Sequence, residues 1–82
     1  MRIDDYLSTV GLIKRRTVAK ELAHNGMITV NGRVVKPAYQ VKPKDIIQLK
    51  GKNALAVEVL ELPSGSIAKT DRENYYKELK VE

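Results

Sequence analysis

Basic side chains recur in one short segment at the spacing that gathers them on one side of a helix. Arg16, Lys20 and His24 stand at i, i+4 and i+8, and helical side chains four residues apart are neighbours. Lys14 and Arg15 come just before them, at the expected first turn, where a helix N-terminus already favours anions. Phosphate is the natural ligand of such a cationic edge, so all five residues are candidates for binding RNA.

The charge of this segment allows two interpretations. Lys14, Arg15 and Arg16 form a like-charge run with no acid nearby in the sequence, and their repulsion favours a polyanionic partner. The alternative is an ordinary solvated helix face. Residues 1–52 hold eleven Lys or Arg against four Asp or Glu, whereas residues 53–82 hold four against six, for a net charge of +5. This asymmetry is typical of a protein that lays one face on a polyanion.

A predicted hairpin adds three candidates to this face. Arg33 and Lys36 lie near its turn, and the amide of Asn31 could bind a base edge or a ribose hydroxyl. The alternative for Asn31 is that Asn-Gly is simply the turn that the backbone requires. Aromatic residues for base stacking are scarce, with four Tyr and no Trp or Phe. We therefore expect recognition of folded RNA by shape and phosphate contacts.

The sequence argues against an enzyme and against a metal site. Asp4 and Asp5 are adjacent at a helix start, where capping explains them better than acid–base chemistry does. The serines have no second His to share, and no glycine-rich phosphate loop is present. With no Cys and one His, neither a thiolate nor an imidazole cluster can hold a metal. We expect no catalysis and no cofactor.

Length and hydropathy place the chain among small single-domain proteins. Its 82 residues support one modest core. No apolar run approaches the length of a membrane span, and the N-terminus lacks the apolar stretch of a signal peptide. We therefore expect a cytoplasmic protein, and a monomer.

Two short helices must position the basic residues. Asp4 can cap the first helix, whose apolar residues Ile3, Leu7 and Val10 stand at i, i+4 and i+7, and Gly11 can end it. The second helix is expected over residues 14–25, ending at Gly26, with an apolar arc made of Val18, Ala19, Leu22 and Ala23. The short link between them forces a sharp change of direction.

Strand signals follow from residue 27 onward. Asn31-Gly32 between β-forming residues predicts a hairpin, because a type I′ turn needs positive φ at both central residues. Further strands are expected over residues 46–49 and 54–62. Residues 63–66 have a linker composition, and a capping box at residues 70–73 predicts a short helix that ends near Lys80. The expected fold class is α+β, with one domain over residues 1–62 and a linker with a helical tail over residues 63–82.

The order of short motifs resembles the S4 RNA-binding domain family. The motifs are Arg2-Ile3-Asp4, Gly11-Leu12, Arg16 with Ala19, Val30-Asn31-Gly32 and Val41 to Ile47, and they lie within residues 2–50. The resemblance implies an S4-like fold, in which a two-helix unit packs on a small twisted antiparallel sheet. It also implies that RNA lies on the face made by the second helix and the following hairpin.

The resemblance carries roles to particular positions. It implies that Arg2, Arg16 and Lys20 contact RNA and that Asp4 orders Arg2 and the first helix, while Gly11, Gly26 and Gly32 support the site at turns. Two positions depart from the family pattern. Arg15 stands where many S4 domains have a capping Ser, which makes the start of the second helix less certain. Lys44 replaces the usual Gly before Asp45, and this suggests a type I turn there.

Within the family, the length and the charged tail look most like the stand-alone S4 proteins of bacterial ribosome-associated quality control, the RqcP group. The heat-shock S4 proteins come next. The first likeness implies binding of tRNA and large-subunit rRNA on obstructed 50S subunits, beside an RqcH-like tailing factor. Alternatives are subunit recycling of the heat-shock type, an S4 module acting in trans with an RNA-modifying enzyme, and a DNA-binding helix-turn-helix protein.

Overall fold

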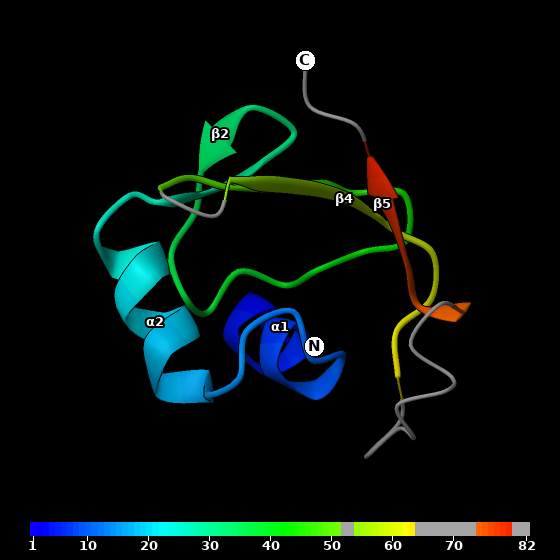
Figure 1. Cartoon of the computed structure of the whole chain (residues 1–82), viewed down its shortest axis with the longest axis horizontal. Coiled ribbons are helices and arrows are strands. Elements are labelled where there is room, and N and C mark those ends of the chain that lie inside the picture. Colours follow the sequence, from blue (N-terminus) through cyan, green and yellow to red (C-terminus); the bar gives the residue numbers. More distant parts are fainter. Residues whose placement is uncertain (52–53, 64–73, 80–82) are drawn as a thin grey trace.

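The computed structural model describes residues 1–51, 54–63 and 74–79. Two helices lie together on one side of an antiparallel sheet (Figure 1). The elements are α1 (Ile3–Thr9), α2 (Arg16–His24), β1 (Ile28–Val30), β2 (Arg33–Val34), β3 (Ile46–Leu49), β4 (Leu55–Val59) and β5 (Tyr76–Leu79). The α+β class and the S4-like arrangement expected from the sequence are confirmed.

The sheet has the strand order β2-β1-β3-β4-β5, and every neighbouring pair is antiparallel. Val30, Ile47 and Val57 lie opposite one another across its three central strands, and all three are buried. They face the helices and share one core with Tyr6 and Leu7 of α1. Within the described residues, no helix is long and apolar enough to cross a membrane.

The first helix matches its prediction except at its cap. Ile3, Leu7 and Val10 are fully buried, as their spacing requires. The N-cap is Arg2 rather than Asp4, and it makes no side-chain capping hydrogen bond. Asp4 lies inside the first turn, and its side chain is occupied by ion pairs described below. The capping role predicted for Asp4 is therefore wrong.

The second helix is shorter than predicted, and its apolar arc is narrower. It begins at Arg16, because Arg15 has an extended backbone and supplies no side-chain cap. Ala19 and Ala23 are buried, but Val18 keeps 43% of its surface exposed. The apolar arc is therefore only partly buried, because the small alanines define the side in contact with the core and Val18 lies on the flank of the helix.

The first turn of the sheet agrees with the sequence and the second does not. Asn31 and Gly32 have φ of 53° and 85°, which confirms the type I′ hairpin. Lys44 has φ of 76°, so the expected type I geometry is wrong. The N–H of Asp45 donates to the carbonyl of Lys42 at 3.1 Å, which closes a type II turn with Lys44 at the position that favours glycine.

Contacts from both sides of the turn hold Lys44 in this conformation. Its N–H donates to the carbonyl of Val59 at 2.7 Å, and the N–H of Val59 donates to the carbonyl of Asp45 at 2.9 Å. The Asp45 carboxylate also accepts from the N–H of Lys42 and the hydroxyl of Tyr39. These long-range contacts outweigh the local strain.

The predicted C-terminal helix is a strand where the structure describes it. Tyr76–Leu79 pairs with β4, and Val59 lies opposite Tyr76. The carbonyl of Tyr75 accepts the hydroxyl of Tyr6 at 2.8 Å and the N–H of Leu60 at 2.9 Å. A short isolated helix is marginal in water, whereas the open edge of β4 offers a full ladder of hydrogen bonds. The capping box at residues 70–73 lies outside the described residues.

We expect Lys44→Gly to stabilise the protein. A non-glycine residue in the left-handed region costs about 1–2 kcal/mol, and glycine would relieve this strain. The extra conformational freedom of glycine in the unfolded chain offsets about half of the relief. The net change should be up to about 1 kcal/mol in the free energy of urea unfolding. Lys42→Gly, which removes the same charge beside the turn, should instead destabilise. A loss of stability in Lys44→Gly would contradict the strained turn.

The pH dependence of stability should report the buried Tyr6. Burial, with a smaller contribution from the charge of Tyr76, raises the pKa of Tyr6 well above its ordinary value of 10.0. The stabilisation that the neutral, buried Tyr6 side chain contributes is therefore complete below pH 10. It is lost as pH rises toward the pKa of Tyr6 in the folded protein, and the free energy of unfolding falls by up to about 1.4 kcal/mol per pH unit. Tyr6→Phe should lose about 0.5–1.5 kcal/mol at pH 7, because the bond to Tyr75 is gone. Its melting temperature should fall less steeply above pH 10 than that of the wild type, and equal slopes would exclude Tyr6 as the cause.

Candidate nucleic-acid interface

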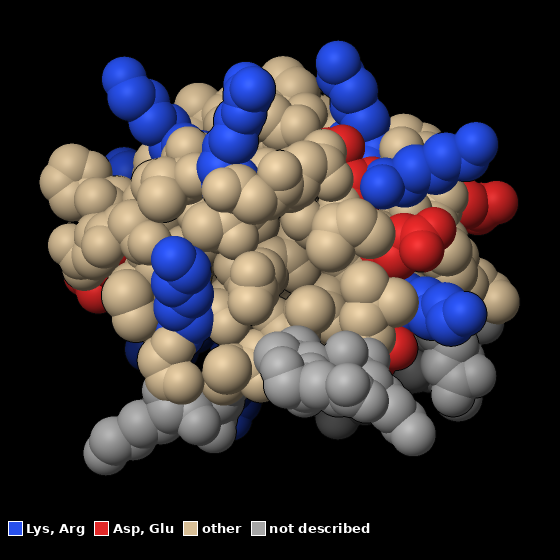
Figure 2. Space-filling model, turned by 90° about the horizontal axis from the view of Figure 1, so that it is seen from above, with Lys and Arg blue, Asp and Glu red and all other residues tan. Residues whose placement is uncertain are grey.

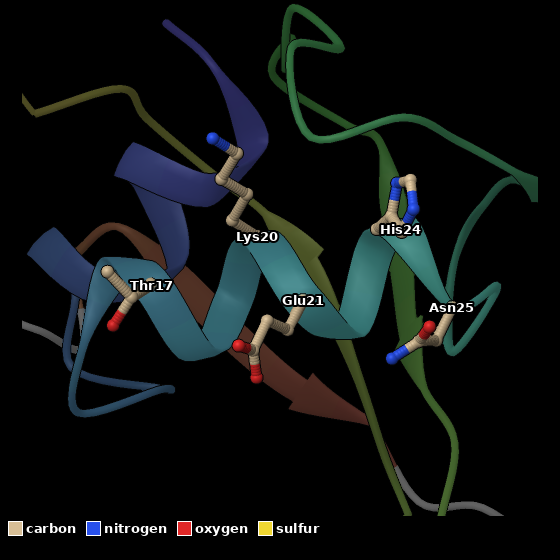
Figure 3. Close-up of a pocket in the computed structure, with 5 residues that line it drawn as sticks. All are labelled: Thr17, Lys20, Glu21, His24 and Asn25. Atoms are coloured by element: carbon tan, nitrogen blue, oxygen red, sulfur yellow. The ribbon is translucent and has the colours of Figure 1, made fainter.

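The cationic stripe predicted on the second helix is present and exposed. Lys20 and His24 project to the same side of α2, and Glu21 projects away from them (Figure 3). Around these side chains lies a shallow hollow of about 570 Å³, which is lined by Thr17, Lys20, Glu21, His24 and Asn25. One flank of α2 thus offers an ammonium group and an imidazole to an anion, and the carboxylate of Glu21 lines the other side of the same hollow.

Arg16 stands one turn before Lys20 and has acidic partners. Its Nε lies 3.0 Å from Oδ1 of Asp5 and 3.6 Å from Oδ2 of Asp4. The expectation of a basic run without a neutralising acid was therefore wrong, because the tertiary contact between α1 and α2 brings the two acids beside it. Both ion pairs run through Nε, so the Nη edge of Arg16, whose side chain is 53% exposed, remains suited to a phosphate.

Asp4 is the buried centre of this charge network. Its side chain is fully buried, and Arg2 grips it with two hydrogen bonds, Nε to Oδ1 at 3.1 Å and Nη2 to Oδ2 at 3.0 Å. Oδ1 also accepts the N–H of Asp5 at 2.8 Å. The Nε and Nη2 edge of the Arg2 guanidinium is therefore bound to Asp4. The contact that the S4 resemblance implies between these two residues is present.

Asn31, Arg33 and Lys36 of the hairpin are all exposed, but the side chain of Asn31 is hydrogen-bonded within the protein. Nδ2 of Asn31 donates to Oδ1 of Asp45 at 3.2 Å. Oδ1 of Asn31 accepts the N–H of Ile46 at 3.0 Å. These bonds tie the hairpin to β3 and favour the structural interpretation of Asn31. Arg33 and Lys36 are exposed beyond the turn, and their contact with RNA stays a prediction.

Charge on the uncovered side of the sheet is uneven. Figure 2 looks down on this side, and Lys and Arg project from its rim while its centre is uncharged. Asp and Glu gather mainly toward the β5 side, where they intermingle with the basic residues. On this side of the sheet, fewer Asp and Glu therefore stand beside the basic residues at the end away from β5.

The family model described as the S4 domain matches residues 1–47. This chain belongs to the S4 domain family. The matched segment covers α1, α2 and the β1–β2 hairpin, so every basic residue proposed above lies inside it. The later strands, β4 and β5, lie beyond the match and complete the sheet.

Relatives of this S4 protein extend the likeness to nearly the whole chain. It is 41% identical to the RQC P-site tRNA stabilizing factor of Bacillus subtilis, covering 100% of this chain and 95% of the relative. It is 42% identical to the protein of that name in Streptococcus pneumoniae, covering 94% and 88%. The trimeric structure of Heat Shock Protein 15 from Vibrio cholerae superposes with a TM-score of 0.88 at 21% identity, covering 96% and 81%, and it supports the fold alone.

Sequence reasoning missed Asp5 as part of the S4 site. Its signal was present, since both acids stand in the first turn of α1 and Arg16 opens α2, but only the packing of the helices reveals the contact. Gly11, Gly26 and Gly32 do have positive φ, as their predicted turn positions require. Lys14 and Arg15 are exposed ahead of α2.

We expect Asp5→Asn to tighten RNA binding. Its carboxylate competes with phosphate for the positive charge of Arg16, although the Nη edge stays free, and asparagine keeps an acceptor that can orient Nε without the negative charge. Because an exposed ion pair contributes up to about 1 kcal/mol, the gain should be about threefold to fivefold in Kd at low salt. Filter binding to tRNA measures it, with Glu78→Gln on β5 as the control for net charge. A gain no larger than that of the control would contradict the competition.

Proposed function

We propose that this chain is a non-catalytic RNA-binding factor that holds tRNA and large-subunit rRNA on obstructed 50S subunits. The observation that carries the proposal is the exposed cationic flank of α2 within an S4 domain. Supporting it, the chain is similar over nearly its full length to proteins named for stabilizing P-site tRNA in RQC. The names of these relatives favour RNA on the ribosome over free nucleic acid.

The proposed mechanism is neutralisation of phosphates on a surface of fixed shape. Lys20 and His24 project from one side of a rigid helix, and Arg16 is oriented by its ion pairs before any RNA arrives. Such preorganised donors bind without a large loss of side-chain entropy. Folded RNA recognised in this way is read by shape and phosphate contacts, and holding it in place requires no bond to be made or broken.

The proposed function includes support of nascent-chain tailing. By resemblance to the stand-alone S4 proteins of ribosome-associated quality control, an RqcH-like tailing factor would act on the subunit that this protein stabilises. The protein would act as a monomer in the cytoplasm.

Sedimentation with purified split 50S subunits tests the proposal: the protein should pellet with subunits that hold a peptidyl-tRNA and much less with empty ones. Equal pelleting with both kinds of subunit would show that the protein does not recognise the tRNA.

Salt and a single substitution should identify the RNA face. If Arg16, Lys20 and two or three further basic residues each neutralise a phosphate, log affinity for tRNA should fall with log salt at a slope of about −3 to −5. Arg16→Ala should make this slope shallower by about one and weaken binding, whereas Lys77→Ala on β5 should change neither. Equal effects of the two substitutions, or a flat salt response of the wild type, would contradict the assignment.

A further inference from the structure

An apolar groove lies on the flank of α2 that faces away from the cationic stripe. It has a volume of about 400 Å³. Its described lining residues are Leu12, Ile13, Val18, Leu22, Met27, Leu49, Lys50, Gly51 and Leu55. They come from the α1–α2 link, α2 and the adjoining ends of β1, β3 and β4. The groove therefore sits where the core reaches the surface.

The groove and the phosphate-binding flank can be occupied at the same time. Val18 and Lys20 are two residues apart on α2, so their side chains point in directions roughly 160° apart around the helix. Ala19 and Ala23 are buried on a third side, against the rest of the fold. RNA held along Lys20 and His24 would leave the Val18 side of the helix uncovered.

The lining favours a protein over RNA as the occupant. The described lining residues include no aromatic side chain on which a base could stack. They are aliphatic or Met apart from Gly51 and Lys50, and a cavity of this volume suits one or two apolar side chains. Val18, with 43% of its surface exposed, offers an apolar contact at the mouth.

Charge at the mouth defines the partner further. Lys50 is the cation among the described lining residues of the groove. The described lining residues include no Asp or Glu. A partner with a carboxylate beside its apolar anchors would neutralise Lys50, whereas a basic segment would be repelled.

We propose that this groove docks an acidic amphipathic segment of a protein bound to the large subunit. The inference rests on the proposed function, because it requires RNA and a protein partner on the same subunit. One flank of α2 then holds RNA and the other holds protein, and the short helix couples the two. The partner is defined by its chemistry: a carboxylate beside one or two apolar side chains.

The test compares two substitutions of matched chemistry at exposed apolar positions. Val18→Glu places a carboxylate at the mouth of the groove, and Leu60→Glu places one beyond the end of β4, where the exposed fraction is a similar 38%. Both variants are full-length and change net charge equally. Each is measured for binding to tRNA, to deproteinised large-subunit rRNA, and to purified 50S subunits that hold a peptidyl-tRNA and the tailing factor.

We expect both variants to bind tRNA and rRNA alike, and Val18→Glu alone to bind the assembled subunit about tenfold or more weakly, as loss of a central contact would produce. A photo-crosslinker at position 18 of the otherwise unchanged chain should then join an acidic segment of a protein. Equal binding of the two variants to the subunit overturns the docking site. Weaker binding of Val18→Glu to bare rRNA, or crosslinking to RNA, also overturns it. If the wild type does not bind the subunit, the proposed function fails and the groove proposal fails with it.

Discussion

The buried carboxylate of Asp4 is the constraint on which the rest of the structure depends. A fully buried charge is tolerated only when it is paired and hydrogen-bonded. Here Arg2, Arg16 and the N–H of Asp5 surround it. Since Arg2 precedes α1 and Arg16 opens α2, a single carboxylate sets the position of the chain start and of both helices. Loss of Arg2 would remove two of the hydrogen bonds to this buried carboxylate and leave Arg16 at 3.6 Å as its cationic partner, at a cost of about 1–3 kcal/mol.

The same network determines how much positive charge reaches the RNA face. Arg2 and Arg16 are balanced by Asp4 and Asp5, so the four residues together carry no net charge. Among the described residues, the basic candidates of the proposed RNA face that have no ion pair are Lys14, Arg15, Lys20, Arg33 and Lys36. The arginines contribute directed hydrogen bonds more than long-range attraction, because their forks are already oriented by the carboxylates. If these arginines contact RNA as proposed, fold stability and RNA affinity are coupled through shared side chains.

Local patterns in the sequence predicted the parts of the fold that local chemistry decides. The apolar spacing of α1, the stripe on α2 and the Asn31-Gly32 turn each depend on neighbours within a few residues. Apart from the helix caps, the misses depend on contacts between distant segments. Lys44 accepts a left-handed backbone because Val59 holds it, and residues 76–79 form a strand because β4 has an edge to pair with. Arg16 meets Asp5 across eleven positions, and no periodicity encodes that contact.

The hydrogen bond from Tyr6 to the carbonyl of Tyr75 joins residues 69 positions apart. Such a separation bears on the order in which the parts of the molecule fold. The helices and the β1–β2 hairpin close over short loops, whereas β5 and its bond to α1 require the ends of the described chain to meet. Contacts over such long loops form slowly. The RNA-facing half can therefore assemble first, with β5 added last. Interactions made after the transition state act mainly on the unfolding rate, so β5 would govern the lifetime of the folded protein rather than the speed of its formation.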